Sequence, residues 1–228
     1  MVSVQRKVSA RALLAVGAVG LSLLALACAP QTSGPPPSTT TTTTSTTLPW
    51  STPTGVWTSF NLTCHVNVLG ADYTFPQSAS VNVDAPATVS AGQVFDATVA
   101  PGPFNVPTQV QGYALTDIHA FTIRFPLSPN VQFVDSVMSA GINMGPGYPS
   151  LSVEGGYLVY RVPGPFVPGS TVQMPKDRLT FKGIGPSGSS VQTQMASLTN
   201  VANFGIGTVD DVCYPNDPNL VFWTTTIN

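Results

Sequence analysis

The stretch "HAFTIRFPL", residues 119–127, alternates apolar and polar side chains. Phe121, Ile123 and Phe125 share one face, and the residues between them are polar. A period of two carried by aromatic and β-branched residues is typical of a strand with one buried face. The alternation therefore predicts a strand that contributes to the core of an all-β domain.

The same pattern recurs along the chain from Trp57 onward. Glycine and proline separate the repeats, and only residues 106–118 leave open a turn of helix. About eight to ten short strands at regular spacing predict a sandwich of two packed antiparallel sheets. Apart from 119–127, the alternating segments are 80–86, 93–100, 131–137, 156–162, 178–184, 190–198 and 220–227.

Four segments carry a resemblance to a known group of proteins. They are "VDAPATVSAGQVFDATVAPGP" (83–103), "RFPLSPN" (124–130), "VPGPFVPGSTVQMP" (162–175) and "CYPNDPNLVFWTTTI" (213–227). Together they resemble exported immunoglobulin-like proteins of actinobacteria, over most of residues 57–228. The resemblance implies an all-β, immunoglobulin-like antiparallel β-sandwich outside the cytoplasm. The group has no established activity, so the resemblance transfers no site residues.

The composition argues against nucleic acid as a partner. Charged residues make up 8% of the chain, whereas it holds 22 prolines and 20 glycines. Downstream of residue 27 the basic residues are five, against all ten acidic ones. This part of the chain thus has no basic patch to neutralise phosphates.

Residues 1–27 have the layout of a secretory signal peptide. Arg6, Lys7 and Arg11 precede an apolar run over 13–27 that is shorter than the roughly 20 residues of a transmembrane helix. An uncleaved membrane anchor is the alternative.

Cys28 follows this run directly, in a context that resembles a bacterial lipobox. Such a box usually has leucine three residues before the cysteine, whereas this chain has Ala25 there. We expect Cys28 to carry a lipid that holds the protein on the outer face of the cell membrane, in the cell envelope. Ordinary secretion after cleavage at Ala27 is the alternative.

Residues 28–56 are expected to form a disordered linker. They contain six consecutive threonines at 39–44, with prolines and serines around them. Such a composition cannot bury enough apolar surface to fold, and it reaches up to about 80 Å when extended. The threonines suit O-linked sugar, although an unmodified spacer fits equally well. The folded domain is then 57–228.

Cys64 and Cys213 remain once Cys28 is assigned to the lipid. In an exported protein two such cysteines are expected to pair, and the alternative is two buried free thiols. The bridge would close a loop of roughly 150 residues, worth about 4–5 kcal/mol on the chain-entropy model.

Little in the sequence points to catalysis, a cofactor or a metal. The only histidines are His65 and His119, and the only glutamate is Glu154. Asp117 could orient His119, but no G-x-S-x-G motif supplies a nucleophile. Residues 183–188 match G-x-G-x-x-G, yet a strand-like segment follows where a dinucleotide site needs a helix. We therefore expect no enzyme and no cofactor.

Two weaker candidate sites stand out. Asp210, Asp211 and Asp217 offer oxygen ligands suited to calcium, against the alternative of a solvated acidic loop. The sequence "PGPF" occurs twice, ending at Phe104 and at Phe166. These rings are candidate surface contacts for a partner, unless each folds back and closes the end of the sandwich.

These observations favour an exported lipoprotein that presents a non-catalytic binding or structural module. Its expected partners are the membrane, through the lipid on Cys28, and an envelope polymer or another surface protein. A carrier of an apolar, lipid-like ligand is the alternative, and it requires a cavity between the sheets. An envelope hydrolase is less favoured, because titratable groups are scarce.

Overall fold

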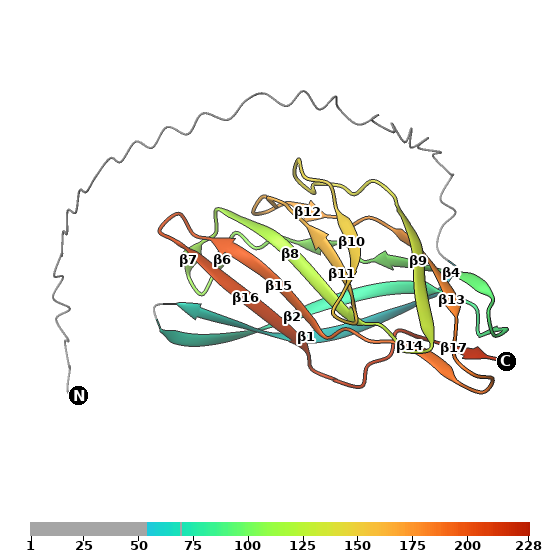
Figure 1. The fold of residues 1–228 in the computed structure, drawn as a ribbon. Helices are drawn as coiled ribbons and strands as arrows, with labels where there is room; N and C mark the ends of the chain where they lie inside the picture. The colour runs from blue at the N-terminus through green and yellow to red at the C-terminus, as the bar shows by residue number, and fades with distance from the viewer. Residues whose placement is uncertain (1–53, 69) are drawn as a thin grey trace, which may run out of the picture. The chain divides into compact units, whose positions relative to one another are not determined.

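The computed structural model describes residues 54–68 and 70–228, which form seventeen strands and no helix (Figure 1). Ten strands make one antiparallel sheet. In spatial order they are β10 (Ser150–Glu154), β11 (Tyr157–Val162), β8 (Asp117–Pro126), β15 (Ser197–Asn203), β16 (Thr208–Pro215), β1 (Val56–Val68), β2 (Ala71–Asp84), β4 (Val94–Pro101), β13 (Asp177–Gly183) and β9 (Val131–Met138).

Seven short strands form three small sheets beside it. Among the described residues, only the pairing of β17 with β3 is parallel. The first small sheet pairs β12 (Thr171–Val172) with β5 (Phe104–Asn105), and the second joins β14 (Ser190–Thr193), β17 (Trp223–Ile227) and β3 (Thr88–Val89). The third is a hairpin of β6 (Gln109–Val110) and β7 (Tyr113–Ala114).

The ten-stranded sheet folds over on itself. Leu158 of β11 belongs to one core cluster with Phe95 of β4 and Leu179 of β13, and among the described residues no buried member of that cluster comes from β15, β16, β1 or β2. In a flat sheet β11 and β4 would lie six strand spacings, roughly 29 Å, apart. Their common core therefore requires the two halves of the sheet to face each other. The predicted immunoglobulin-like antiparallel β-sandwich is confirmed.

The two halves differ from the prediction in being one continuous sheet. β1 runs through its middle and pairs with β2 over its whole length. On its other side β1 pairs with β16, from Leu62 to Val66. Large twisted sheets curl readily, so one sheet can supply both layers of a sandwich.

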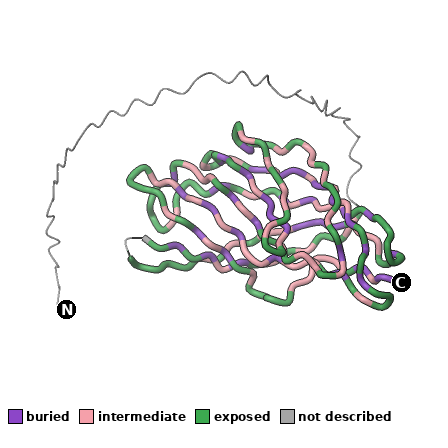
Figure 2. Tube along the Cα trace, in the orientation of Figure 1, coloured by how far each residue is buried: buried purple, intermediate pink, exposed green. Residues whose placement is uncertain are grey.

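Burial alternates along the inner strands as the sequence predicts (Figure 2). Phe121 and Ile123 of β8 are buried, and the residues next to them are not. In β13 the buried positions are Asp177, Leu179, Phe181 and Gly183, so a carboxyl group shares the face of large apolar side chains.

The structure shows the conformation of two segments that the sequence pattern left open. Residues 106–118 contain no turn of helix; instead, Gln111 and Gly112 join β6 to β7 with φ of 53° and 83°. Positive φ at both central residues is the signature of a type I′ hairpin turn. Residues 183–188 lead from β13 into the strand β14, so their glycines do not open a helix.

Candidate functional site

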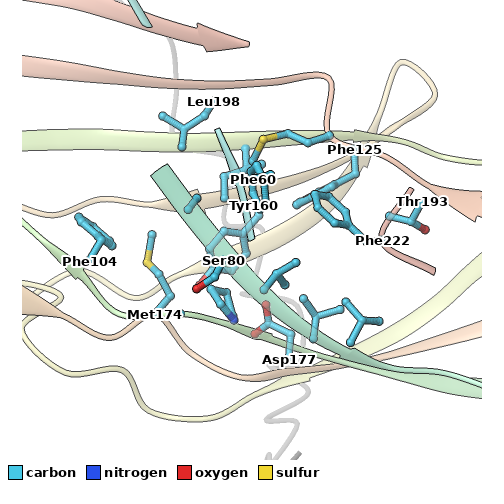
Figure 3. Close-up of a pocket in the computed structure, with 18 of the residues that line it drawn as sticks. Phe60, Ser80, Phe104, Phe125, Tyr160, Met174, Asp177, Thr193, Leu198 and Phe222 are labelled. Atoms are coloured by element: carbon cyan, nitrogen blue, oxygen red, sulfur yellow. The ribbon is translucent and has the colours of Figure 1, made fainter. Parts of the chain in front are cut away.

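An apolar cavity of about 120 Å³ lies between the two halves of the folded sheet (Figure 3). Leu62 lines it from one half, and Phe121 and Leu158 line it from the other. Exposed and half-exposed residues, such as Pro103 and Phe222, also belong to the lining, so the cavity reaches the surface.

Aromatic rings make up much of the wall. The ring centroids of Phe60 and Phe222 are 5.2 Å apart, and those of Phe104 and Phe121 are 6.1 Å apart. Tilted and offset pairs at these separations are favourable contacts between rings. The walls are thus held by packing between β1, β5, β8 and the segment before β17.

Besides polar lining residues such as Gln77 and Thr193, three polar groups in this wall lack a partner among the described residues. The hydroxyl of Tyr160, Oδ1 of Asp177 and Nε1 of Trp223 are buried and have no hydrogen-bond partner within the described protein. Native structures leave few such groups unpaired, and each one needs an explanation. Here all three belong to residues that line one cavity.

Burial dominates the electrostatics of this site. Asp177 is 5% exposed, and burial raises the pKa of its carboxyl group to about 8. The pKa of the Tyr160 hydroxyl is also raised, first by burial and then by the nearby carboxylate of Asp177. Both groups are therefore mainly protonated at neutral pH, and both can donate a hydrogen bond.

The strand period puts these groups inside. Asp177 is two residues before Leu179 and four before Phe181, so all three side chains leave β13 on one face. Tyr160 lies between the buried Leu158 and Val162 at the same period. Neither residue was predicted as a site residue, although the alternation of the segment 178–184, extended back to Asp177, would have indicated a buried acid.

The disulfide lies beside the cavity. Cys64 and Cys213 face each other on β1 and β16 and are bonded in the structure, as the sequence predicts, with both side chains fully buried. Oε1 of Gln77, a residue that lines the cavity, is 3.5 Å from Sγ of Cys64.

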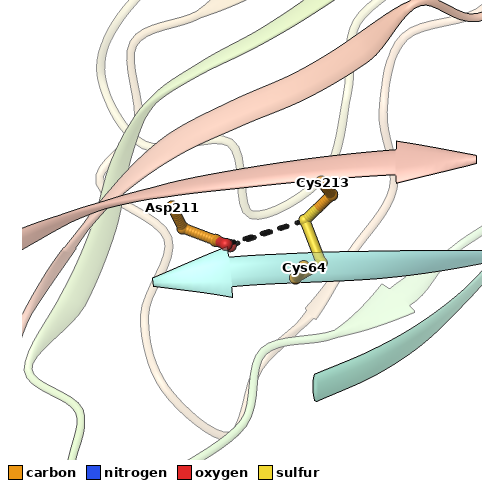
Figure 4. Close-up of side chains that lie close together, drawn as sticks. All are labelled: Cys64, Asp211 and Cys213. Carbon is orange, nitrogen blue, oxygen red and sulfur yellow. Dashed lines mark hydrogen bonds between the residues drawn. A yellow bond between two sulfur atoms is a disulfide. The ribbon is translucent and has the colours of Figure 1, made fainter. Parts of the chain in front are cut away.

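Asp211 approaches the disulfide from the same face of β16 (Figure 4). Its Oδ2 is 3.6 Å from Sγ of Cys213 and accepts a hydrogen bond of 3.0 Å from Nδ2 of Asn200. Burial raises the pKa of Asp211 to about 6, and the bond from Asn200 opposes this rise. A disulfide sulfur carries no hydrogen, so the contact becomes a hydrogen bond only when Asp211 is protonated.

The three candidate calcium ligands are not brought together. Asp210 and Asp211 are neighbours on β16, so their side chains leave opposite faces of the sheet, and Asp217 follows the strand in a loop. In residues 54–68 and 70–228, the only group of three ligand-type side chains is Asp211 with Cys64 and Cys213. Both sulfurs are committed to the disulfide, so this group is no metal site, and calcium at the three aspartates stays a prediction without support from their placement.

The surface role suggested for the two phenylalanines does not fit the burial of Phe166, and for Phe104 it stays a prediction. Phe166 is fully buried, and Phe104 is half-buried with its ring centroid 5.6 Å from that of Phe166. Both rings pack on Phe121. The alternative, a ring that folds back onto the core, describes the fully buried Phe166, and the half-buried ring of Phe104 packs against the same core.

His119 does pair with Asp117, with 2.8 Å between Nδ1 and Oδ1. Asn203 donates to the other carboxyl oxygen of Asp117 at 3.1 Å. Among the described residues no serine, threonine or cysteine is hydrogen-bonded to His119. The pair is therefore an oriented histidine without an adjacent nucleophile.

The predictions for residues 1–53 lie outside the described residues, and this includes Cys28. Within the part of the chain that the structure describes, no helix has the length and apolar character needed to cross a membrane.

The chain resembles known proteins in its structure and not in its sequence. No family model matches it, and no curated protein matches its sequence. It is similar to a protein from Corynebacterium diphtheriae described as membrane anchored, with 18% identity and a TM-score of 0.56. The match covers 76% of this chain and 38% of that one, so this chain spans well under half of its length.

Two cohesin modules show a more distant similarity. One comes from a family 33 glycoside hydrolase of Clostridium perfringens, with 10% identity, a TM-score of 0.38 and coverage of 66% of this chain and 96% of the module. The other is a non-cellulosomal cohesin from Archaeoglobus fulgidus, with 9% identity, a TM-score of 0.37 and coverage of 65% and 91%. At these identities the solved structures bear on the fold alone, and the Corynebacterium protein shares that fold.

Proposed function

We propose that this protein is an exported envelope lipoprotein, tethered through Cys28, that presents its β-sandwich as a non-catalytic binding module. The observation that carries the proposal is the fully buried disulfide between Cys64 and Cys213, which spans 149 residues. Disulfides of this kind persist in oxidising compartments and are rare in the cytosol. The signal-like residues 1–27 supply the route of export.

Two further observations support the proposal. The Corynebacterium protein with the same fold is described as membrane anchored, which fits an envelope location. The Asp117–His119 pair has no nucleophile bonded to it among the described residues, which favours a binding module over a hydrolase.

Binding is favoured over a purely structural role by the cavity. At about 120 Å³ it is well below the roughly 300–1,000 Å³ of pockets that hold drug-sized ligands. A carrier of whole lipids is therefore disfavoured, whereas a small ligand is compatible with this volume. An envelope polymer or another surface protein remains a proposed partner for the outside of the domain.

The experiment is intact mass of the protein extracted from membranes, compared with a Cys28→Ser variant. We expect the wild type to begin at Cys28, to carry the mass of a lipid and to partition into detergent. The variant should lack that mass and remain in the aqueous phase. Reduction should add the mass of two hydrogens to both proteins.

Two results would contradict the proposal. A wild-type protein that starts at Cys28 or earlier without lipid, and that partitions like the variant, would rule out the tether. A native protein found reduced in the cytosol with residues 1–27 attached would rule out export as well.

A further inference from the structure

The cavity has the features of a small ligand site with unpaired polar groups in an apolar wall. Its walls are mainly Phe, Leu, Val and Met side chains, which favour an apolar body. The unpaired groups of Tyr160, Asp177 and Trp223 interrupt these walls. If apolar side chains or an apolar ligand simply filled the cavity, these three groups would stay without hydrogen-bond partners. Apolar packing therefore does not explain why polar groups lie at these positions.

The three groups share one requirement. The indole Nε1 of Trp223 can only donate, and the hydroxyl of Tyr160 and the protonated carboxyl of Asp177 can both donate. A ligand atom that accepts hydrogen bonds would pair with them. In Figure 3 the carboxyl group of Asp177 is turned toward the cavity from one side of it.

The charge of the ligand follows from the same residues. Asp177 is buried, and no positively charged residue lines the cavity. An anion would enter an apolar site without a countercharge, which is strongly unfavourable. The accepting atom therefore belongs to a neutral hydroxyl or carbonyl group.

The volume limits the size of the ligand. An apolar cavity of about 150 Å³ in another protein binds benzene, so one of about 120 Å³ that is open to the surface suits a molecule of about the size of benzene. We infer that the cavity binds a small neutral molecule with a compact apolar body and one hydroxyl or carbonyl oxygen, held by Tyr160, Asp177 and Trp223. This inference deepens the binding role proposed above and rests on it, but it does not depend on the lipid.

The test uses the full exported chain carrying Cys28→Ser, which removes the lipid attachment atom, leaves the cavity residues unchanged and avoids detergent. Phenol is the probe, benzene lacks its oxygen, and benzoate adds a negative charge. Binding is followed by two-dimensional NMR, with shifts expected at residues that line the cavity. We expect phenol to bind at neutral pH and benzoate not to bind.

Two variants separate recognition of the oxygen from filling of the cavity. Tyr160→Phe and Trp223→Phe each remove one polar group and keep an aromatic ring. Each should weaken phenol about tenfold, the effect of one lost hydrogen bond, and change benzene less than twofold. Tyr148→Phe is the matched control, because Tyr148 is 92% exposed and does not line the cavity.

Three outcomes would overturn the inference. A folded protein that binds neither phenol nor benzene has no usable site. Equal losses of phenol and benzene in the Tyr160 and Trp223 variants would mean that the oxygen is not recognised. A crystal structure grown with phenol that shows only water on the three groups would assign them to hydration. None of these results bears on the lipid at Cys28, which the mass measurement tests separately.

Discussion

Asp177 shows how one residue can set the pH response of the whole domain. A carboxyl group whose pKa is higher in the folded state than in the unfolded chain takes up protons on folding. The stability that it contributes is fully present below its unfolded pKa and is lost as the pH rises through the folded value. For Asp177 this interval runs from 3.8 to about 8.

Other shifted carboxyl groups act at lower pH. Asp211 has the same sign, but its interval ends at about 6. Glu154 has the opposite sign, because its hydrogen bond from Arg161 lowers its pKa to about 2, so its contribution is lost below pH 4.5. Between pH 6 and 8, Asp177 is the shifted carboxyl group that still titrates.

We therefore predict that the free energy of unfolding falls between pH 6 and 8 and that Asp177→Asn removes most of this fall. At about 1.4 kcal/mol per pKa unit, the loss over two pH units should be on the order of 2 kcal/mol. Urea unfolding at several pH values measures it. Asp210→Asn is the control, since Asp210 is exposed. A variant at Asp177 that keeps the wild-type slope would show that another group is responsible.

The two phenylalanines of the repeated "PGPF" sequence differ in burial, and this separates their energetic roles. Phe166→Ala should cost about 3–5 kcal/mol, because the ring is fully buried and its removal leaves a cavity. Phe104→Ala should cost less, since Phe104 is half-buried. Thermal unfolding measures both, with Val167→Ala at a 63% exposed position as the control. Similar small losses at both phenylalanines would contradict the packing described here.

At the scale of elements, the β6–β7 hairpin turns on a residue that is poorly suited to its conformation. Gln111 has a φ of 53°, which asparagine tolerates better than glutamine does. Gln111→Asn should therefore stabilise the domain by about 0.5 kcal/mol, and Gly112→Ala should destabilise it. Chemical unfolding of both variants, beside Gln109→Asn, checks the assignment. A loss of stability in Gln111→Asn would mean that this turn does not favour asparagine.

Strands were predictable from the sequence where local alternation alone decides them. The segment 119–127 is an example, because Phe121 and Ile123 indicate its buried face without any knowledge of the strands that pair with it. The hairpin at 109–114 could not be predicted from the sequence. Its turn depends on positive φ angles at Gln111 and Gly112, and glutamine is not a residue type that indicates a positive φ. The order of the strands in the sheet could not be predicted from the sequence either. β8 pairs with β15, which lies far along the chain, and no local sequence pattern indicates that pairing.

The candidate site could not be predicted from the sequence either, because its residues come from strands that are far apart along the chain. Tyr160 lies in a predicted strand and Asp177 lies just before another, and only the folding over of the sheet brings both to one cavity. Cys64 and Cys213 were predictable as a pair because the disulfide requires only an oxidising compartment and two remaining cysteines.

At the scale of the whole molecule, the disulfide is the largest single restraint on the unfolded chain. We predict that the double variant Cys64→Ala/Cys213→Ala loses about 5 kcal/mol of stability, as the chain-entropy model gives for a closed loop of 149 residues. Denaturant unfolding compares it with the oxidised wild type, and Cys28→Ser serves as a control with an intact bridge. If the double variant and the wild type unfold at the same denaturant concentration, the bridge does not stabilise the fold.

The position of the bridge within β1 also governs how the domain responds to mechanical load. A pull from the N-terminal side would peel β1 away from its neighbours starting at Val56. Peeling must stop at Cys64, because a covalent bond fastens that residue to β16 in the middle of the sheet. A domain pulled from this side would thus unravel no further along β1 than Cys64, and the chain between Cys64 and Cys213 would be shielded from the load.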